Sequence, residues 1–392
     1  MKILAISHSC AADVNQQLFV ELNELPETDV ALVLPSRWRQ DYSEHTTPSK
    51  FLPGLRFNVH PLSVFAPGSL HLHFYLRGLD AVLMRFRPDV VLVDEEPWSF
   101  VLAQVGRICA ARRIPFLPYT KQNILKRYPV PFGWIERQTY LHAAGIVALS
   151  EDVRDVLRAK GYRGDCPILP HACDLSLFHP GHSEDLRQKL KLSGVVIGYL
   201  GRLVSEKGLQ TLVEAAKALA SAKDPVPFTV LFVGAGPHED ELRAMTVQSG
   251  VKERFIFAGA VAHGEAGDYL RCMDIFVLPS LTTRSWKEQF GRVIVEAMAC
   301  GVPVAGSNSG HIPYLIEETG GGLVFAEGDA NDLAAKLSTL LHDGGTRKGL
   351  GAAGAKAVSA NYTYPSIARR LHEVLGRFSN HRNAPLHSNR CE

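Results

Sequence analysis

The sequence predicts an α/β protein with two parallel, doubly wound sheets, one in each half of the chain. Short β-rich segments alternate with stretches of helical periodicity, and this alternation is typical of parallel sheets covered by helices. It pauses over residues 167–191, a stretch with prolines, a glycine and no sustained period, and restarts at residue 195. We therefore expect two similar domains, with a ligand crevice where the carboxyl ends of their sheets face each other.

The first half of the chain contains five β-rich segments separated by helical patterns. Between the second and third segments, leucines and a phenylalanine recur at helical spacing from residue 69 to 87, and Pro88 ends the pattern. We expect a helix there. The expected strands are residues 1–7, 30–34, 90–94, 116–119 and 145–149.

The second half repeats this order, with expected strands at 195–200, 229–233, 254–257, 275–278 and 302–305. The predicted domains are both Rossmann-like. The first covers residues 1–173 and the second 192–363, joined by a linker at 174–191. A helix at about 364–378 is expected to pack back on the first domain, and residues 379–392 form a polar tail.

Composition excludes several classes of protein. Of the 392 residues 46% are hydrophobic and 21% charged, the ordinary balance of a soluble globular protein, and the net charge of +2 gives no global field for nucleic acid. Seven scattered cysteines without a C-x-x-C pair favour a reduced, cytoplasmic protein. The amino terminus lacks a signal-peptide core, and no apolar run reaches the ~18 residues of a membrane span.

A glycine-containing turn with two cations follows the first strand of the second half. Gly201, Arg202 and Lys207 lie between an apolar strand and an amphipathic helix. Glycine lets the backbone approach a ligand, free N–H groups of a first helical turn bind anions, and Arg and Lys both suit phosphate. An ordinary solvated loop with a helix cap is the alternative for this segment taken alone.

Two glutamates eight positions apart mark a second block. If Glu288 lies in a loop and residues 290–300 are helical, Glu296 lies ~12 Å further along at ~1.5 Å per residue. Gly291 leaves the helix start bare, so its N–H groups could meet phosphate oxygens. The alternative is that Glu288 caps the helix and Glu296 is surface charge, although Glu296 has almost only apolar neighbours in its helix.

Together these motifs resemble the family-4 retaining glycosyltransferases of the GT-B fold. The pattern G-R-x(4)-K-G, then Pro279-Ser280, then E-x(7)-E and EAMACGVPV, is similar to that family in order and spacing from about residue 198 to 325. The resemblance implies that Arg202 and Lys207 bind the diphosphate of a nucleotide sugar and that Glu296 binds its ribose. It also implies that Glu288 contacts the transferred sugar, with the backbone of three residues, Phe290, Gly291 and Arg292.

The same resemblance implies same-face displacement, in which charge builds on the leaving phosphate and is stabilised by fixed cations and helix N-termini. No metal and no cofactor beyond the donor nucleotide sugar are expected, and the chain has no Asp-x-Asp motif. The catalytic candidates are Glu288, Arg202 and Lys207. The acceptor is expected to be a glycan, a lipid-linked molecule or a small molecule.

The first half departs from the family pattern at two places. The loop after the first strand reads Ser-His-Ser-Cys-Ala-Ala where the family has two glycines, which leaves Ser9 and Cys10 as acceptor-side candidates. Lys121, Gln122 and Asn123 stand where many members have a histidine. A polar or cationic group there can still contact a sugar, but the role of the family's histidine is not carried over to it.

Residues 94–96, Asp-Glu-Glu, end an expected strand, so Glu95 is a candidate to orient or deprotonate an acceptor hydroxyl. Acidic residues in a first helical turn, with proline near its start, are the favoured alternative. His71 and His73 supply only two metal ligands, so a solvated helix face is favoured over a metal site.

A basic stretch at 107–137 carries seven Lys or Arg and one acid among aromatic residues. It suits a phosphorylated or acidic acceptor or an anionic membrane surface, which leaves peripheral attachment at the inner face of the membrane open. Two other functions stay open: a GT-B phosphorylase or nucleotide-sugar epimerase, and a non-catalytic scaffold that binds sugar nucleotides. No nucleic-acid partner is expected.

Overall fold

The computed structural model describes residues 1–39 and 45–379 and divides into two units. Unit 1 comprises Met1–Pro170 together with the chain from Tyr364 onward, and unit 2 is His171–Thr363. The division after Pro170 lies three residues before the expected end of the first domain. The expected linker at 174–191 belongs to unit 2 and contains the helix α6 (Glu184–Lys189). Residues 380–392 of the expected tail lie outside the described residues.

Unit 1 contains a six-stranded, all-parallel sheet with strand order β10-β9-β8-β1-β2-β5. Its central strands are almost continuously apolar and are buried on both faces, as expected for a parallel sheet covered by helices. The strands are β1 (Lys2–Ser7), β2 (Asp29–Pro35), β5 (Asn58–Leu62), β8 (Val90–Asp94), β9 (Phe116–Thr120) and β10 (Val147–Ala148). Two short antiparallel pairs, β3 (Arg37–Trp38) with β4 (Thr47–Pro48) and β6 (Val64–Phe65) with β7 (Phe74–Tyr75), stand apart from it.

The edge strand β5 was not among the expected strands. It contains His60 and Pro61 and is only partly buried, so it lacks the continuous apolar run of its neighbours. Proline fits there because an edge strand has one side on which no N–H is needed.

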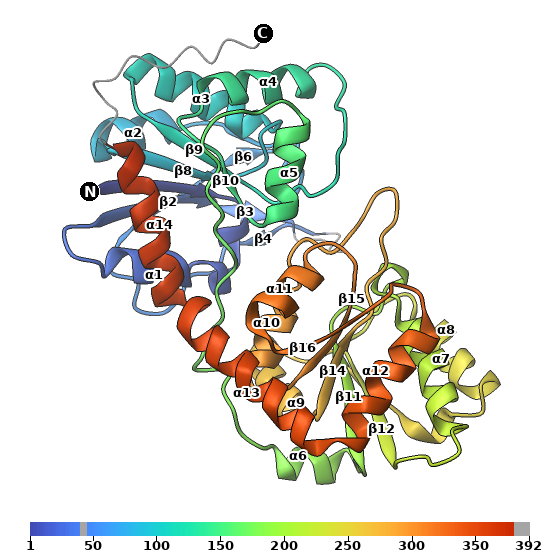
Figure 1. Cartoon of the computed structure of the whole chain (residues 1–392). Helices are drawn as coiled ribbons and strands as arrows, with labels where there is room; N and C mark the ends of the chain where they lie inside the picture. Colours follow the sequence, from blue (N-terminus) through green and yellow to red (C-terminus); the bar gives the residue numbers. More distant parts are fainter. Residues whose placement is uncertain (40–44, 380–392) are drawn as a thin grey trace. The chain divides into compact units, whose positions relative to one another are not determined.

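The helices of unit 1 are α1 (Gln17–Asn23), α2 (Leu79–Phe86), α3 (Phe100–Arg112), α4 (Phe132–His142), α5 (Glu151–Ala159) and α14 (Tyr364–Ser379), with short 3-10 turns η1 (Ser9–Ala11) and η2 (Asp13–Asn15). The last described helix, α14, packs against α1, so segments far apart in the sequence lie side by side in this unit (Figure 1). Helices α3 and α4 also pack against each other.

The helix expected over 69–87 is wrong in its first half. Gly78, with a φ of 89°, precedes the first residue of α2, and residues 74–75 form the strand β7 instead. Leu72 and Leu76 are exposed, so their helical spacing does not reflect a buried stripe. The consequence is that His73 lies in a loop and is buried rather than on a solvated helix face.

Unit 2 contains a second six-stranded parallel sheet, with strand order β13-β12-β11-β14-β15-β16. Its strands are β11 (Val195–Leu200), β12 (Phe228–Val233), β13 (Phe255–Gly259), β14 (Ile275–Leu278), β15 (Val304–Ser307) and β16 (Gly322–Phe325). The edge strand β16 was not expected, because it begins in a run of glycines. The two parallel doubly wound sheets confirm the predicted fold class.

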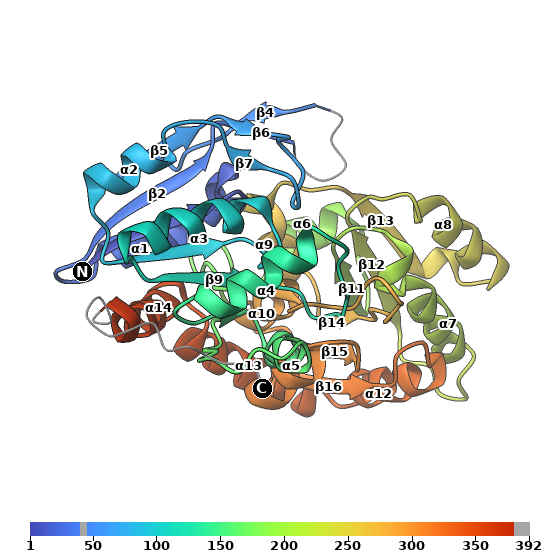
Figure 2. The ribbon, with the colours of Figure 1, turned by 90° about the horizontal axis from the view of Figure 1, so that it is seen from above.

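The helices of unit 2 are α6 (Glu184–Lys189), α7 (Leu209–Ala220), α8 (Glu239–Gln248), α9 (Ala266–Arg271), α10 (Arg292–Ala299), α11 (Ile312–Thr319), α12 (Ala330–His342) and α13 (Gly344–Asn361), with 3-10 turns η3 (Ser205–Lys207), η4 (Lys252–Arg254) and η5 (His263–Glu265). Helix α7 packs beside α8 and against α12, whereas α10 packs against α9 and α13 (Figure 2).

Two further observations concern the chain as a whole. No helix among the described residues is long and apolar enough to cross a membrane. The six cysteines that the structure describes are all buried free thiols.

Candidate active site

The order of strands in unit 2 reverses between β11 and β14. From β11 the chain adds β12 and β13 on one side, and then β14, β15 and β16 on the other. In open parallel sheets, ligands bind at the carboxyl ends of the strands at this switch point. The loops that emerge there are residues 201–208 after β11 and 279–291 after β14. They contain the sequence-predicted donor residues except Arg292 and Glu296, which lie on the helix α10 that follows.

Glycines let the loops of this edge approach closely. A Cβ atom on Gly234 would lie 1.8 Å from the carbonyl oxygen of Gly201, and one on Gly310 would lie 1.9 Å from that of Glu288. Both glycines have positive φ, which other residues rarely adopt. The positions of Gly201 and Glu288 therefore depend on the absence of side chains at their neighbours.

Lys207 and Glu288 form an ion pair at the switch point. The Lys207 Nζ lies 2.6 Å from Glu288 Oε2, and the Ser280 hydroxyl donates to the same oxygen at 2.8 Å. Glu288 and Ser280 are buried, and the ammonium also lies over the Trp286 ring, 5.0 Å from its centroid. The structure thus brings together two of the three catalytic candidates, from loops 81 residues apart.

Glu296 lies on α10, which is preceded by Gly291 in a left-handed conformation. The expected helix at 290–300 is thus slightly shorter, Arg292–Ala299, and Glu296 lies in its second turn. Glu296 is 7% exposed, and no hydrogen bond to its carboxyl group is found among the described residues. Burial raises its pKa to about 7 against a smaller opposing effect of Arg292. A buried carboxyl without a partner is not ordinary surface charge, and it is available to a ligand hydroxyl.

The other predicted donor residues lie near the Lys207–Glu288 ion pair in the sequence. Arg202 and Arg292 are exposed, whereas Phe290 is buried between the rings of His311 and His171, with ring centroids 5.6 and 5.4 Å away. Phe290 therefore holds the loop in place, and its backbone rather than its ring is what a ligand could meet.

Unit 1 has its own switch point, between β1 and β8. From β1 the sheet extends through β2 to β5 on one side and through β8 to β9 and β10 on the other. The residues at the carboxyl ends of these two strands are Ser7–Ser9 and Asp94–Glu96. Helix α3 begins only at Phe100, with Ser99 as its N-cap, so the favoured assignment of the three acids to a first helical turn is wrong.

Each of the three acids has its own partners. Asp94 accepts hydrogen bonds from the hydroxyls of Ser7 and Ser9, both at 2.8 Å, and pairs with Lys121 Nζ at 2.7 Å. Burial alone would raise the pKa of Asp94, but Lys121 and His8 together outweigh it and the pKa is lowered. Glu96 is bonded to the Thr120 hydroxyl and the Lys121 amide, and burial raises its pKa.

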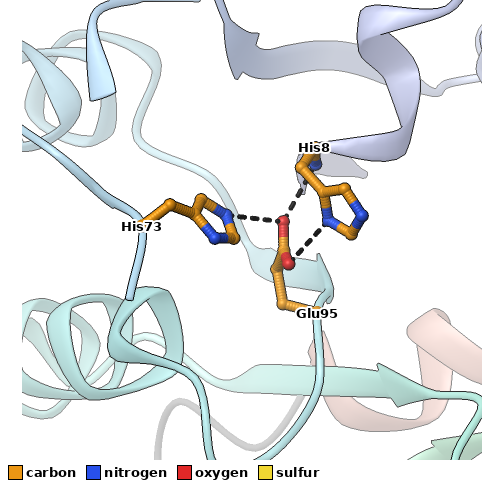
Figure 3. Close-up of side chains that lie close together, drawn as sticks. All are labelled: His8, His73 and Glu95. Atoms are coloured by element: carbon orange, nitrogen blue, oxygen red, sulfur yellow. Dashed lines mark hydrogen bonds and ion pairs between the residues drawn. The ribbon is translucent and has the colours of Figure 1, made fainter. Parts of the chain in front are cut away.

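Glu95 is held between two histidines (Figure 3). The His8 amide donates to Glu95 Oε1 at 2.9 Å, His8 Nδ1 lies 2.7 Å from Oε2, and His73 Nε2 lies 3.3 Å from Oε1. Burial alone would raise the pKa of Glu95, but the two imidazoles outweigh it and lower the pKa well below its usual range. For His8, burial alone would lower the pKa, but Glu95 outweighs it and the pKa is raised.

The sequence analysis did not identify three residues at this switch point as site residues. His8 was passed over as part of a loop, His73 was assigned to a solvated face, and Asp94 was read only as part of an acidic run. The side-chain atoms of His8, His73 and Glu95 that could bind a metal ion all lie within 4.8 Å of one another, so His73 is close to two further metal-ligating side chains. The sequence did not reveal this cluster, because His8, His73 and Glu95 are far apart along the chain.

The other acceptor-side candidates of unit 1 differ in their hydrogen-bond partners and burial. Lys121 pairs with Asp94, and Ser9 with Asp94 as well. Gln122 donates to the Tyr128 hydroxyl at 2.8 Å, and Asn123 is buried. Cys10 is buried with its Sγ 3.4 Å from the Asn15 carbonyl oxygen, and burial raises its pKa to about 12, so this thiol is not presented to a ligand.

The basic stretch of unit 1 borders an apolar cavity of about 190 Å³ between α3 and α4, with Arg107 and Trp134 in its lining. Trp134 and Val130 are 57% and 86% exposed. Two of the seven cations are engaged elsewhere, because Arg112 pairs with Asp80 and Lys121 with Asp94.

Two family descriptions match the chain. Residues 183–357 match the glycosyl transferases group 1, and residues 11–168 match the glycosyl transferase 4-like domain. A 2-deoxystreptamine glucosyltransferase from Streptomyces kanamyceticus is 31% identical over 66% of this chain and 70% of its own length. A GDP-mannose-dependent phosphatidylinositol monomannoside mannosyltransferase from Mycobacterium tuberculosis is 31% identical over 55% of this chain, and the alignment spans only 57% of that relative.

Solved structures share the fold over most of the chain. HepE from Anabaena, in complex with UDP, has a TM-score of 0.74 at 20% identity and covers 96% of this chain and 100% of its own. Sucrose-phosphate synthase from Thermosynechococcus elongatus has a TM-score of 0.71 at 20% identity, covering 96% of this chain and 98% of its own.

Proposed function

The chain belongs to the glycosyl transferases group 1 family and is a glycosyltransferase, and from this premise we propose what it transfers and how. The proposed reaction moves a sugar, with retention of anomeric configuration, from a nucleoside diphosphate sugar to a hydroxyl group. The acceptor is a glycan, a lipid-linked molecule or a small molecule. The observation that carries this proposal is the buried Lys207–Glu288–Ser280 group at the switch point of unit 2.

The proposed roles follow from charge and burial. As the bond between sugar and diphosphate breaks, negative charge grows on the leaving oxygens, and cations already fixed in place stabilise it most because they need not reorganise. Lys207 is held by Glu288 and Trp286, and exposed Arg202 lies on the same loop. Gly291 leaves the amino end of α10 open to phosphate oxygens. Glu296, buried and without a protein partner among the described residues, would bind the ribose hydroxyls.

We propose that this reaction needs no metal or other cofactor, since Lys207 and Arg202 supply positive charge at the diphosphate. Activity should then persist after treatment with a chelator such as EDTA. Loss of activity that added Mg²⁺ or Mn²⁺ restores would contradict this part of the proposal.

The direct test incubates the full chain with UDP-glucose and GDP-mannose against an acceptor panel. We would use 2-deoxystreptamine, inositol 3-phosphate and phosphatidylinositol vesicles, because relatives act on acceptors or donors of these kinds by name. Release of nucleoside diphosphate that depends on an acceptor, with the product anomer retained by NMR, is the expected result. An inverted product contradicts the mechanism, conversion of donor alone indicates an epimerase, and binding without turnover indicates a scaffold.

We further propose that the α3–α4 surface of unit 1 binds an anionic membrane. Exposed Trp134 lines the same cavity as Arg107, and exposed Val130 precedes α4 by two residues. Aromatic, apolar and basic side chains of this kind partition into membrane interfaces. The protein should co-sediment with vesicles containing phosphatidylglycerol more than with pure phosphatidylcholine vesicles. Trp134→Ala should weaken this binding several-fold, whereas Val247→Ala, an equally exposed apolar residue of unit 2, should not. Equal binding by the two variants would contradict the proposal.

A further inference from the structure

We propose that unit 1 contains a Zn²⁺ site formed by the side chains of His8, His73 and Glu95. Each histidine directs one ring nitrogen at the Glu95 carboxylate (Figure 3). The site lies entirely within unit 1, and the ion takes no part in the proposed sugar transfer. The inference is therefore independent of the proposed function.

The ligand atoms have the spacing that a tetrahedral ion needs. Zn²⁺ binds histidine nitrogens and carboxylate oxygens at ~2.0–2.2 Å, so two ligands at the corners of a tetrahedron lie ~3.4 Å apart. His73 Nε2 lies 3.3 Å from Glu95 Oε1, and His8 Nδ1 lies 2.7 Å from Oε2. The ligand atoms of all three residues lie within 4.8 Å of one another, so small side-chain rotations place one ion in contact with all of them.

The contacts of His73 leave a lone pair facing the carboxylate. Its Nδ1 lies 2.7 Å from the Ser69 carbonyl oxygen, which only accepts, so Nδ1 carries a hydrogen. In the neutral ring Nε2 then has no hydrogen, although it faces the Glu95 carboxylate, which also only accepts. Two such acceptors need a cation between them, either a proton or a metal ion. A bond from the other ring nitrogen to a backbone carbonyl is also how histidine ligands of metal ions are oriented.

His8 and Glu95 complete the set of ligands. Two imidazoles and one carboxylate are a common set for Zn²⁺, with water in the fourth position. The His8 amide donates to Glu95 Oε1 at 2.9 Å, which holds the carboxylate in place. The side chains of His73 and Glu95 are 0% and 1% exposed, whereas that of His8 is 20% exposed, so an ion enters from the side of His8.

A buried hydroxyl near the cluster also lacks a partner. Tyr75 is 1% exposed, and its hydroxyl has no hydrogen-bond partner among the described residues. Burial raises the pKa of Tyr75, and the charge of Glu95 raises it further, which places the hydroxyl close to that carboxylate. Buried polar groups are nearly always hydrogen-bonded, so an unpartnered one beside three ligand atoms indicates a bound ion or the water attached to it.

The nitrogen ligands select the class of ion. Ca²⁺ and Mg²⁺ prefer shells of oxygen atoms, whereas imidazole suits Zn²⁺ and other transition metals. The ring of Trp38 lies 5.0 Å from that of His8 and 4.9 Å from that of His73 between centroids, so an aromatic side chain packs against both imidazoles. The ion joins the loop after β1, the segment before β7 and the end of β8, and an ion that binds only the folded state stabilises it.

The test titrates Zn²⁺ into the full chain without a histidine tag, after treatment with EDTA and removal of the EDTA. Calorimetry should show one ion bound per chain, and Tm should rise with the Zn²⁺ concentration. With Co²⁺ in place of Zn²⁺, visible absorption bands should report tetrahedral ligation. His8→Ala should weaken binding at least ~10²-fold, since loss of even an outer partner of a ligand costs ~10–100-fold.

His142→Ala is the matched control, because His142 is an exposed histidine of the same unit whose Nδ1 is bonded to the Gln138 carbonyl oxygen. It should bind Zn²⁺ as the wild type does. Glu95→Gln keeps the shape of the side chain but removes its charge, and it should weaken binding as His8→Ala does. Circular dichroism confirms that each variant is folded, and His8→Ala decides the question if Glu95→Gln is not.

Two outcomes would overturn the inference. Equal affinity of His8→Ala and His142→Ala for Zn²⁺ would show that the ion binds elsewhere on the surface. Absence of binding by the wild type would show that a proton, and no metal ion, lies between His73 and Glu95. Neither measurement uses turnover, so a failure of the proposed function would leave this test unaffected.

Discussion

The two sheets of this protein have equivalent switch points, but the side chains at these points differ in chemical type. In unit 2 a buried carboxylate, that of Glu288, pairs with the ammonium group of Lys207. In unit 1 a buried carboxylate, that of Glu95, lies between the imidazole rings of His8 and His73. The comparison teaches that the same strand topology can surround a buried carboxylate with different partners in the two units.

The loops at the carboxyl ends of the strands also differ between the two units. The loops of unit 2 approach one another through glycines with positive φ, such as Gly234, which leave backbone groups accessible to a phosphate. The loop after β1 in unit 1 has no glycine and is anchored by side chains instead, including Ser9 on Asp94 and His8 on Glu95. The loops of unit 2 are therefore positioned by close backbone approach, and the loop after β1 in unit 1 by side-chain hydrogen bonds.

Removing the fixed charge gives the largest expected effect. Lys207→Ala should lower kcat about 10²- to 10³-fold, as for loss of one preorganised group that stabilises a developing negative charge. Steady-state kinetics with the donor and acceptor that the wild type uses measure this loss.

Lys217→Ala, on the exposed surface of α7, is the control for Lys207→Ala and should behave as the wild type. Equal kcat values for Lys207→Ala and Lys217→Ala would contradict the role given to the Lys207 charge.

Filling the space at a glycine of unit 2 gives an intermediate effect. A Cβ at Gly234 would meet the Gly201 carbonyl carbon and oxygen, and its φ of 137° is unfavourable for alanine. Strain and overpacking together should cost about 2–3 kcal/mol in the free energy of unfolding. Urea unfolding measures this cost.

Gly264→Ala is the matched control for Gly234→Ala, since nothing lies within 4 Å of a Cβ there and its φ is not positive. It should change the stability by less than about 0.5 kcal/mol. Equal destabilisation by the two alanines would remove the argument that close backbone approach distinguishes unit 2.

The smallest expected effect concerns Glu296, the buried carboxyl group of the unit 2 site whose pKa is raised. Its raised pKa of about 7 means that the folded protein keeps a proton which the unfolded chain, with the usual pKa of 4.5, has released. The unfolded state therefore binds fewer protons between these values, and stability falls as pH rises from about 4.5 to 7. Glu296→Gln removes this dependence and should be more stable than the wild type by about 1–2 kcal/mol at pH 8.

At pH 4 that advantage should vanish, because Glu296 is then protonated in both states. Urea unfolding at the two pH values tests this, with Glu214→Gln on the exposed face of α7 as the control. A gain that is the same at pH 4 and pH 8 would show that burial of the charge is not its cause.

The sequence alone determined the fold class and most strands of both sheets. Buried parallel strands are short continuous apolar runs, which are visible locally, as in β8 and β14. The edge strands β5 and β16 were missed, because proline, histidine and glycine interrupt that signal. The false first half of the helix at 69–87 arose because exposed leucines happened to recur at helical spacing.

The unit 2 residues were also accessible from sequence, since Gly201, Lys207 and Glu288 belong to local motifs on either side of a strand or helix end. Their pairing was decided by the tertiary structure, which joins loops that follow different strands. In unit 1 the sequence named Glu95 but assigned its segment to a helical turn and His73 to a solvated face. Only the fold brings residues 8, 73 and 95 together, because their contact depends on the β1–β8 pairing and on a buried loop, and neither has a local signature.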